Sequence, residues 1–206
     1  MYNGAIKPVV YHGYWRNMGV EVELKVRLDD FEMVKKQLTA LGKYNRSYHK
    51  SDSYWFSPQL INSNVRIRHE NGLEADGAVH QSIMVTYKIK EISQGIEVND
   101  EREFSVSDVD VFEELLRRIG MHQEIRKEKN GWAWNIASET TEQPSILAEL
   151  SLVTGLGWFL ELEILCTEEE IIASRSRLLA LLAILEIPED RIEGRPYTQL
   201  LKDLEI

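Results

Sequence analysis

The sequence predicts an α+β domain, in which an antiparallel sheet of about eight strands curls into a barrel and helices pack on its outside. Three observations favour this fold class. About eight segments alternate apolar with polar residues, most of these segments are long enough to wrap around a barrel, and segments with a helical apolar stripe interrupt them. With 206 residues, of which 43% are hydrophobic, the chain can bury the core of one such domain.

The bounds of the individual elements follow from the alternation of strands and from the helical spacing of apolar residues. Strands are expected at 19–27, 46–57, 63–70, 80–91, 96–106, 122–136, 145–153 and 158–166. Helices are expected at 28–42, 107–120, 167–188 and 196–204. Gly42 and Gly120 end the first two helices, and Ser107 and Thr167 are expected to cap the second and third.

Domain organisation, charge and cysteine usage narrow the class of protein. Residues 1–18 are predicted to be an irregular lead-in, and 19–206 a single domain. The formal net charge of −10 argues against a nucleic-acid partner, because affinity for phosphate backbones comes mostly from Lys and Arg.

Cys166 is the single cysteine, so no internal disulfide can form and a reducing compartment, the cytoplasm, is expected. No apolar run has the length of a membrane span, and we expect no membrane partner.

On the polar side of the predicted strands, charges of the same sign stand next to each other. In VEVELKVR, residues 20–27, Glu21 and Glu23 precede Lys25 and Arg27 along one side. Later strands present the acids Glu101, Glu103, Glu149, Glu161 and Glu163 and the bases Arg66, Arg68, Lys88, Lys90, Lys127 and Lys129. Like charges side by side on a sheet are destabilising, so their segregation by sign needs a physical reason.

Two interpretations fit these charges. They can form the solvated outer face of an antiparallel sheet, which commonly faces water on one side. They can instead line the lumen of a closed barrel, with acids on one wall and bases on another, while the apolar sides point outward beneath the helices. Segregation by sign favours the closed barrel, since exposed faces usually mix charges of both signs.

The residue types indicate which ligand such a lumen would hold. Clustered carboxylates without His or Cys partners form an all-oxygen site suited to Mg²⁺ or Mn²⁺. Clustered Lys and Arg bind polyanions, and Arg takes phosphate oxygens through paired hydrogen bonds. A metal that neutralises two phosphates, with basic side chains on the remaining oxygens, is the usual arrangement for phosphoryl transfer. The charge pattern therefore favours a polyphosphate or a nucleoside triphosphate bound with a metal ion.

The order of these segments resembles a known family. Glu21-Val22-Glu23-Leu24-Lys25 is similar to the ExExK signature of the CYTH superfamily, the triphosphate tunnel metalloenzymes, which include class IV adenylate cyclases, thiamine triphosphatases and tripolyphosphatases. VRIRHE, VTYKIK, EREF and FLELEI follow in the order of the family's paired-Arg strand, Thr/Lys strand, mid-chain acids and late ExE strand. GLGWFLELEI and EGRPYTQLL resemble the class IV cyclase branch, so the resemblance runs from about residue 19 to the end. It implies a closed antiparallel barrel of roughly eight strands, the triphosphate tunnel, with helices outside.

The resemblance also implies roles for the matching residues. The metal ligands would be Glu21, Glu23, Glu161, Glu163 and Glu149. The triphosphate would be bound by Lys25, Arg27, Arg66, Arg68, Lys88, Lys90, Lys127, Lys129 and Arg195. Catalysis would involve Lys25, Lys88, Glu101 and Glu103. The cofactor would be Mg²⁺ or Mn²⁺, the substrate would be tripolyphosphate, ATP or thiamine triphosphate, and the class IV cyclase relatives make a homodimer an expectation.

Three positions depart from the family pattern. Members often show Lys-x-Arg on the sixth strand, but here Gly131 follows Lys129, so the Arg is missing although Lys127 precedes it on the same face. Ser151 stands where an acid is common near the seventh strand, and Pro196 stands in place of the last helix's Ser. These departures leave metal and triphosphate binding in place, but they prevent the transfer of one member's substrate or reaction.

Four functional hypotheses remain open on the sequence. Hydrolysis of tripolyphosphate or of an organic triphosphate is favoured, because it needs no nucleobase pocket and none can be recognised in the sequence. A class IV-type cyclase that makes cyclic AMP and pyrophosphate from ATP is the first alternative, and the C-terminal half favours it. The others are a barrel that binds polyphosphate or nucleotide without turnover and a structural barrel with a charged surface. Positioning and charge stabilisation would serve the hydrolase and the cyclase equally.

Overall fold

The computed structural model describes residues 20–59, 63–93, 96–138 and 143–204, with the backbone alone at 63, 88–93 and 96–101. The strands are β1 (Val20–Leu28), β2 (Lys43–Phe56), β3 (Ser63–Glu74), β4 (Val79–Ser93), β5 (Ile96–Ser105), β6 (His122–Ile136), β7 (Ile146–Val153) and β8 (Gly157–Cys166). The helices are α1 (Phe31–Leu41), α2 (Val109–Arg118), α3 (Ile171–Ile184) and α4 (Tyr197–Lys202), with 3-10 turns η1 (Glu168–Glu170) and η2 (Glu189–Arg191). The predicted α+β class is confirmed.

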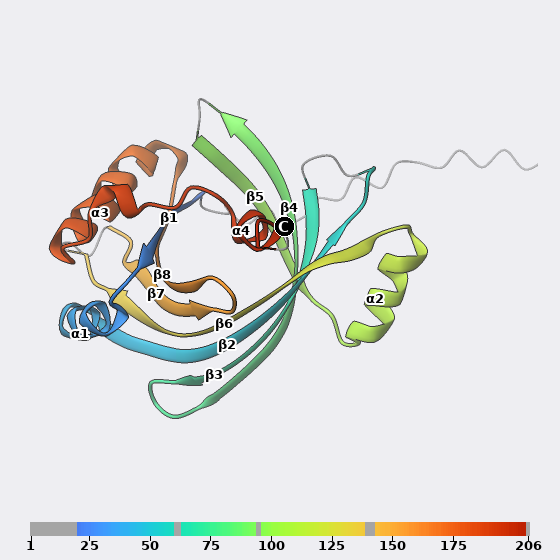
Figure 1. The fold of residues 1–206 in the computed structure, drawn as a ribbon, viewed down its shortest axis with the longest axis horizontal. Coiled ribbons are helices and arrows are strands. Elements are labelled where there is room, and N and C mark those ends of the chain that lie inside the picture. Colours follow the sequence, from blue (N-terminus) through green and yellow to red (C-terminus); the bar gives the residue numbers. More distant parts are fainter. Residues whose placement is uncertain (1–19, 60–62, 94–95, 139–142, 205–206) are drawn as a thin grey trace, which may run out of the picture.

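All eight strands form one antiparallel sheet in the order β1-β8-β7-β6-β2-β3-β4-β5. Figure 1 shows long, strongly bent strands, with α1 and α3 at one end of the sheet, α2 at the other and α4 near the middle. The predicted closed barrel is not confirmed. The edge strands β1 and β5 approach each other, but among the described residues no backbone ladder joins them.

The free edge of β1 is paired in another way. Val26 forms an antiparallel bridge with Ile192, and the Glu193 backbone N–H donates to the Lys25 carbonyl at 2.8 Å. Unpaired strand edges leave backbone N–H and C=O groups without partners, so this contact satisfies part of the edge. The segment between η2 and α4 thus runs beside β1.

The helix boundaries follow the predicted signals with two corrections. Asp108 caps α2, its carboxylate accepting from the Val111 backbone N–H at 3.0 Å, so the prediction of Ser107 is wrong by one residue. Thr167 begins the next helical turn, as predicted, and forms a capping box with Glu170. The turn they begin is 3-10, however, and the predicted helix over 167–188 is a 3-10 turn followed by the shorter α3.

The apolar sides of the strands face the helices. The larger buried cluster joins Leu24, Val26 and Leu162 of the sheet to Val34 of α1 and Leu178 of α3. A second cluster joins Trp55, Ile67 and Val85 to Leu116 of α2 and the following Met121. The prediction that the helices pack on the outer, apolar side of the sheet is therefore confirmed, and the polar side is left for the interior.

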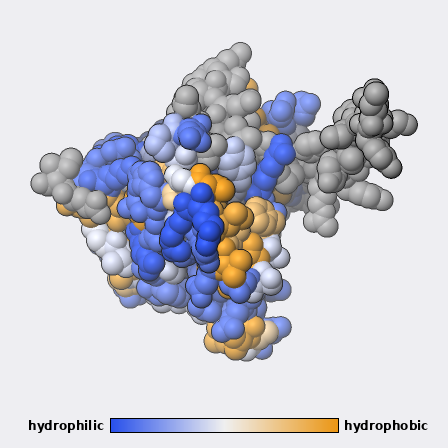
Figure 2. All heavy atoms as spheres, turned by 90° about the vertical axis from the view of Figure 1, so that its right-hand side faces the viewer, coloured by the Kyte–Doolittle hydropathy of each residue, from blue (hydrophilic) through white to orange (hydrophobic). Residues whose placement is uncertain are grey.

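The outward surface of α2 is apolar in part. Val111, Leu115 and Ile119 lie one helical turn apart and are 62%, 49% and 59% exposed. Figure 2, which faces the side of the molecule that carries α2, shows hydrophobic side chains gathered beside hydrophilic ones.

Within the described residues, no helix combines the length and the apolar character needed to cross a membrane.

Candidate functional site

The charged residues of the strands gather on one side of the sheet, which we call the inner face. Side chains alternate along a strand, so Lys25 lies on the side opposite Leu24 and Val26, whose side chains pack beneath the helices. Most of the basic residues here are deeply buried. Exposed fractions are 8% for Lys25, 4% for Lys50, 5% for Lys127 and 3% for Lys129. Charges this buried do not form the solvated surface that was the alternative interpretation.

Ion pairs join strands that are not neighbours across the inner face. Lys129 on β6 pairs with Glu161 on β8, and Lys50 Nζ on β2 lies 2.6 Å from Glu149 Oε1 on β7. Each pair reaches over one intervening strand, a gap of about 10 Å that long side chains can span. The strong bend of the strands, visible in Figure 1, brings such side chains closer still.

The predicted metal ligands share one wall of the inner face. Glu23 of β1 lies directly opposite Glu163 of β8, and Glu149 of β7 lies opposite Glu161 of β8. Glu23 keeps part of its surface exposed to solvent, but the protein surrounds much of its carboxyl group. This partial loss of water raises the pKa of Glu23 to about 7, and repulsion from Glu161 and Glu21 raises it further. Burial, then repulsion from Glu23 and Glu149, raises the pKa of Glu163 to about 7. This wall holds more negative charge than its basic neighbours balance.

Two of these acids are held ionised by lysines. Burial opposes the ionisation of Glu149, but attraction to Lys50 and Lys129 outweighs it and lowers the pKa of Glu149 to about 2. Burial likewise opposes the ionisation of Glu161, and Lys129 overcomes it, so the pKa of Glu161 is also lowered. The wall therefore contains paired carboxylates, Glu149 and Glu161, beside the repelling carboxylates Glu23 and Glu163.

The repelling carboxylates fit a divalent cation. No group of three described His, Cys, Asp or Glu side chains is close enough to hold a metal unaided. Mg²⁺ usually keeps several waters and is bound by one or two carboxylates together with substrate phosphates. Glu23 and Glu163 supply that number of hard oxygen ligands, and their raised pKa values reflect negative charge that a cation would relieve.

The opposite part of the inner face is basic. Arg68 of β3 donates to Asp52 of β2 through Nε at 2.7 Å and through Nη2 at 2.9 Å, and Lys127 Nζ lies 2.9 Å from Asp52 Oδ2. The Asp52 side chain has no exposed surface. Two predicted triphosphate-binding residues therefore share one buried acid.

Arg66 belongs to a second polar group nearer the open edge. Its Nη2 donates to Thr86 Oγ1 at 2.8 Å and to Glu103 Oε1 at 3.3 Å, and Thr86 Oγ1 donates to the same oxygen at 2.9 Å. The Glu103 side chain is 47% exposed. The structure thus brings together two predicted residues, Arg66 and Glu103, through a threonine on the strand between them.

The C-terminal helix adds an aromatic ring to the basic part of the inner face. The buried Tyr197 ring of α4 has Lys25 Nζ at 4.3 Å, Lys129 Nζ at 5.0 Å and Lys127 Nζ at 5.1 Å from its centroid. Lys25 Nζ also donates to the Arg195 carbonyl at 2.5 Å. Ammonium groups this close to a ring are attracted to its face, so α4 helps to hold three lysines together.

The remaining predicted ligand-binding residues make other contacts or have side chains outside the described part of the chain. Arg27 Nη1 donates to the Leu156 carbonyl at 2.7 Å. The Arg195 side chain is exposed and pairs with Glu193 Oε2 at 2.7 Å, so its carbonyl, rather than its guanidinium, contacts Lys25. The side chains of Lys88, Lys90 and Glu101 lie outside the described residues; the Lys88 and Glu101 backbones are paired between β4 and β5.

Several inner-face residues escaped the sequence prediction, and most of them lie on β2. They are Tyr48, Lys50, Asp52 and Tyr54 of β2, with Ser151 of β7 and Tyr197 of α4. On β2 both sides are polar, because His49, Ser51 and Ser53 alternate with the buried residues. Alternation therefore located this strand, but it did not show which of its polar sides faces inward. A signal was available in the charges alone, since Lys50 and Asp52 are two residues apart and so share one face.

Gly131 shows what replaces the family's missing Arg. A Cβ at this position would lie 2.3 Å from the Leu150 carbonyl, 2.9 Å from Ser151 Cβ and 2.9 Å from Tyr48 Oη. The space beside β6 is thus already filled by the Tyr48 ring and the neighbouring β7 backbone. Gly131 and Ser151, two of the departures from the family pattern, lie directly opposite each other on β6 and β7.

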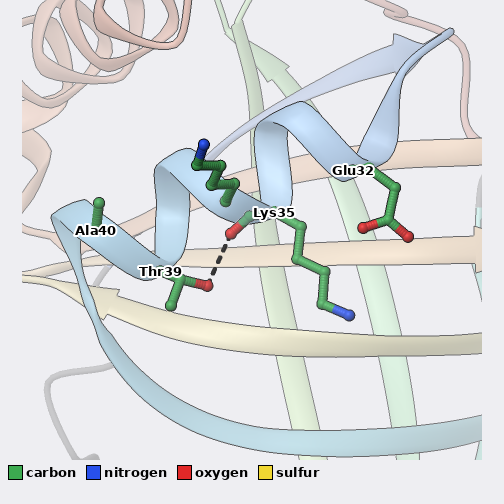
Figure 3. A pocket seen from close by; sticks show the side chains of 5 residues that line it. Glu32, Lys35, Thr39 and Ala40 are labelled. Carbon is green, nitrogen blue, oxygen red and sulfur yellow. Dashed lines mark hydrogen bonds between the residues drawn. The ribbon is translucent and has the colours of Figure 1, made fainter.

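A separate hollow lies on the outer surface of α1. It measures about 390 Å³ and is lined by Glu32, Lys35, Lys36, Thr39 and Ala40. Figure 3 shows these side chains fanning outward from the helix, with the Thr39 hydroxyl donating to the Lys35 carbonyl at 2.8 Å. They do not converge, and the hollow is away from the inner face, so we do not assign it a function.

Comparison with known proteins supports the family. No family model matches the chain. The chain is 28% identical over 189 residues to MJ0240 of Methanocaldococcus jannaschii, which is named as a candidate adenylate cyclase; the match covers 88% of this chain and 98% of that protein. The solved PH1819 protein of Pyrococcus horikoshii has a TM-score of 0.70 and 25% identity, over 89% of this chain and 98% of that one.

A third protein shares the fold at lower sequence identity. HpAC1 of Hippeastrum, described as a candidate adenylyl cyclase with a dominant triphosphatase activity, shares the fold with a TM-score of 0.59 and 15% identity, over 90% of this chain and 96% of that one. These similarities support the resemblance of the chain to the CYTH superfamily. The residues that resemble its ExExK signature occupy the inner face at β1, beside the late ExE strand β8. Such a resemblance does not by itself select a reaction.

Proposed function

We propose that this protein is a metal-dependent enzyme that binds a triphosphate chain on its inner face and hydrolyses it. One observation carries the proposal: a wall of carboxylates, in which Glu23 and Glu163 lie directly opposite each other, stands beside a group of buried lysines and half-buried arginines. A triphosphate bound with a divalent cation presents the complementary charges to both parts at once.

The acidic and basic residues of the inner face would have different roles in the proposed reaction. Glu23 and Glu163 would hold Mg²⁺ or Mn²⁺, with Glu21, Glu149 and Glu161 nearby; the metal would neutralise phosphate charge and polarise the phosphorus under attack. The basic residues would orient the phosphate oxygens and stabilise their charge: Lys25, Arg66, Arg68, Lys127, Lys129 and, as proposals without described side chains, Lys88 and Lys90. Glu101 and Glu103 would act near the attacking water.

The ion pairs of the inner face suggest how the triphosphate would bind. Lys129 and Lys50 are paired with Glu161 and Glu149 in the structure. Phosphate oxygens would replace these carboxylates on the lysines, and the released carboxylates would face the metal. Binding of the anion and of the cation would therefore support each other. The exchange also keeps buried charges compensated in both states.

Adenylate cyclase activity is the second proposal. The relative from M. jannaschii and a solved protein from Vibrio parahaemolyticus are named as candidate adenylate cyclases; the latter has a TM-score of 0.69 and 18% identity. The same inner face would serve a cyclase if the ribose 3′-hydroxyl attacked the α-phosphorus and pyrophosphate left. HpAC1, whose description gives triphosphatase activity as dominant, favours hydrolysis as the first proposal.

A substrate panel tests both proposals. Tripolyphosphate, thiamine triphosphate and ATP are each supplied with Mg²⁺ or Mn²⁺, and orthophosphate, pyrophosphate and cyclic AMP are measured separately. We expect orthophosphate without cyclic AMP. Pyrophosphate formed in step with cyclic AMP would select the cyclase, and binding without any product would select a non-catalytic barrel. A homodimer, which the resemblance implies, is tested by sedimentation equilibrium on the same sample.

A further inference from the structure

We infer that Asp52 is a positioning residue that holds Arg68 and Lys127 in place for the triphosphate. The inference rests on the function proposed above and adds a residue of β2, a strand that contributes none of the family motifs quoted from the sequence. Asp52 is 1% exposed, so it is too deeply buried to be an ordinary surface carboxylate.

The contacts of Asp52 fix both cations in orientation. The Nε and Nη2 groups of Arg68 donate to its two oxygens in a paired arrangement, at 2.7 and 2.9 Å. Lys127 Nζ lies 2.9 Å from Oδ2 and also donates to Tyr54 Oη at 3.0 Å. The Tyr54 hydroxyl in turn donates to Asp52 Oδ2 at 3.4 Å. The paired bond occupies one edge of the guanidinium and leaves the Nη1 side of Arg68 for a phosphate oxygen.

The charge balance explains why one carboxylate is needed and why one is enough. Burial of two neighbouring cations without a counter-ion is strongly unfavourable. Burial opposes the ionisation of Asp52, but attraction to Lys127 and Arg68 outweighs it and keeps its pKa well below the ordinary value. One negative charge against two positive charges leaves the cluster with a net charge of about +1. That surplus remains available to attract a phosphate.

The number of cations that it binds distinguishes Asp52 from Glu149 and Glu161 on the inner face. Glu149 and Glu161 each have short contacts with a single lysine, and Arg46 Nη2 lies farther from Glu149, at 3.7 Å from Oε1. A phosphate that captured the lysine would therefore leave the acid without a short contact to a cation. Asp52 instead binds an arginine through two hydrogen bonds and a lysine at the same time. We therefore expect the Asp52 pairs to persist when the triphosphate binds, so that Arg68 and Lys127 are held ready before it arrives.

Kinetics of the full-length Asp52→Asn variant with tripolyphosphate and Mn²⁺ test the inference. The substitution keeps the size of the side chain and removes its charge. We expect kcat/KM to fall about 100-fold, the loss typical of misplaced catalytic groups, at a temperature where circular dichroism shows the variant folded. Glu128→Gln is the matched control. Glu128 lies next to Lys127 on the opposite side of β6, where it accepts from Ser51 Oγ at 2.6 Å, and its substitution is expected to leave kcat/KM unchanged.

Two further variants keep the test decisive. If Asp52→Asn does not fold, Tyr54→Phe removes only the hydroxyl between Lys127 and Asp52, and we expect kcat/KM to fall about 2- to 10-fold. In an Arg68→Lys background, Asp52→Asn should add less than it does alone, because both changes break the same paired bond. Losses that multiply independently would contradict a route through Arg68.

The outcomes distinguish this inference from the proposed function. A wild-type protein that neither binds nor turns over tripolyphosphate, thiamine triphosphate or ATP, by calorimetry and by product formation, overturns both. A wild-type protein that turns over one of them, with Asp52→Asn lowering only the melting temperature and leaving kcat and KM unchanged, overturns the positioning role alone. A loss in kcat/KM with the fold retained, absent in Glu128→Gln, supports it.

Discussion

Glu23 and Glu163 lie directly opposite each other on the antiparallel strands β1 and β8, so two carboxylates occupy neighbouring positions of the inner face. Like charges in this relation destabilise a sheet. The arrangement is compatible with a stable fold because each group has a pKa raised to about 7 and can hold a proton when no cation is present. A cost of this kind in the free protein is expected where a ligand later supplies the missing charge.

Glu163→Gln should therefore change stability and metal affinity in opposite directions. Removing one of the repelling carboxylates should stabilise the metal-free protein by about 1 kcal/mol at pH 8. The same change should weaken Mn²⁺ binding about tenfold or more, because a ligand is lost. Urea unfolding and electron paramagnetic resonance titration with Mn²⁺ measure the two effects. Glu168→Gln, at an exposed position in η1, is the control, and equal effects of both variants would contradict the prediction.

Metal binding should weaken in acid. Glu23 and Glu163 have pKa values of about 7 in the metal-free protein, and a carboxyl group must lose its proton to bind a metal. Below pH 7 we expect Mn²⁺ affinity to fall about tenfold per pH unit for each carboxyl group that must ionise. Calorimetry in buffers of different ionisation enthalpy measures the protons released. An affinity that stays constant between pH 5 and 7 would rule out these two ligands.

Stability of the metal-free protein should show the opposite dependence on pH. The folded-state pKa values of Glu23 and Glu163 lie above 4.5, so the folded state binds more protons than the unfolded state between about pH 4.5 and 7. Their stabilising contribution is complete below pH 4.5 and is lost as the pH rises through 7. Urea unfolding from pH 5 to 8 should give a falling free energy of unfolding, with a shallower fall in Glu163→Gln than in the wild type.

Lys50→Met should destabilise the protein most at neutral pH. Lys50 makes contacts of 2.6 and 2.8 Å with the two oxygens of Glu149, whose pKa is about 2. Loss of one partner of a buried ion pair typically costs about 3–5 kcal/mol. The pKa of Glu149 should rise in the variant, so the loss should shrink as the pH falls toward 5. Lys43→Met, at an exposed position on the same strand, should be nearly neutral; a loss independent of pH would point to packing instead.

Gly131→Ala should be destabilising although glycine is unfavourable in a strand. The added Cβ would lie 2.3 Å from the Leu150 carbonyl, which is backbone and cannot turn away. We expect a loss of about 1–3 kcal/mol, as for other overpacked positions. Gly194→Ala is the control, because a Cβ there meets nothing within 4 Å. A stable Gly131→Ala variant would show that β6 and β7 separate more easily than their contacts indicate.

Much of the fold could be predicted from local sequence alone. Period-two alternation located the strands, and helix signals located α1 and α2, because burial on one side leaves a direct imprint on neighbouring residues. Closure of the barrel could not be predicted this way. Whether β1 meets β5 through hydrogen bonds depends on the bend and twist summed over the whole sheet, and in the structure the segment around Ile192 takes part of that edge.

The sequence by itself determined which strands carry charge on one side and of which sign, since side-chain alternation is a property of each strand. Only the tertiary structure decided which charges meet. Lys129 reaches Glu161 and Lys50 reaches Glu149 because the sheet bends, and Asp52 gathers Arg68 and Lys127 because β2 lies between β3 and β6. These partners are far apart in the chain, and their pairing energy depends on distance and burial, which no local pattern records.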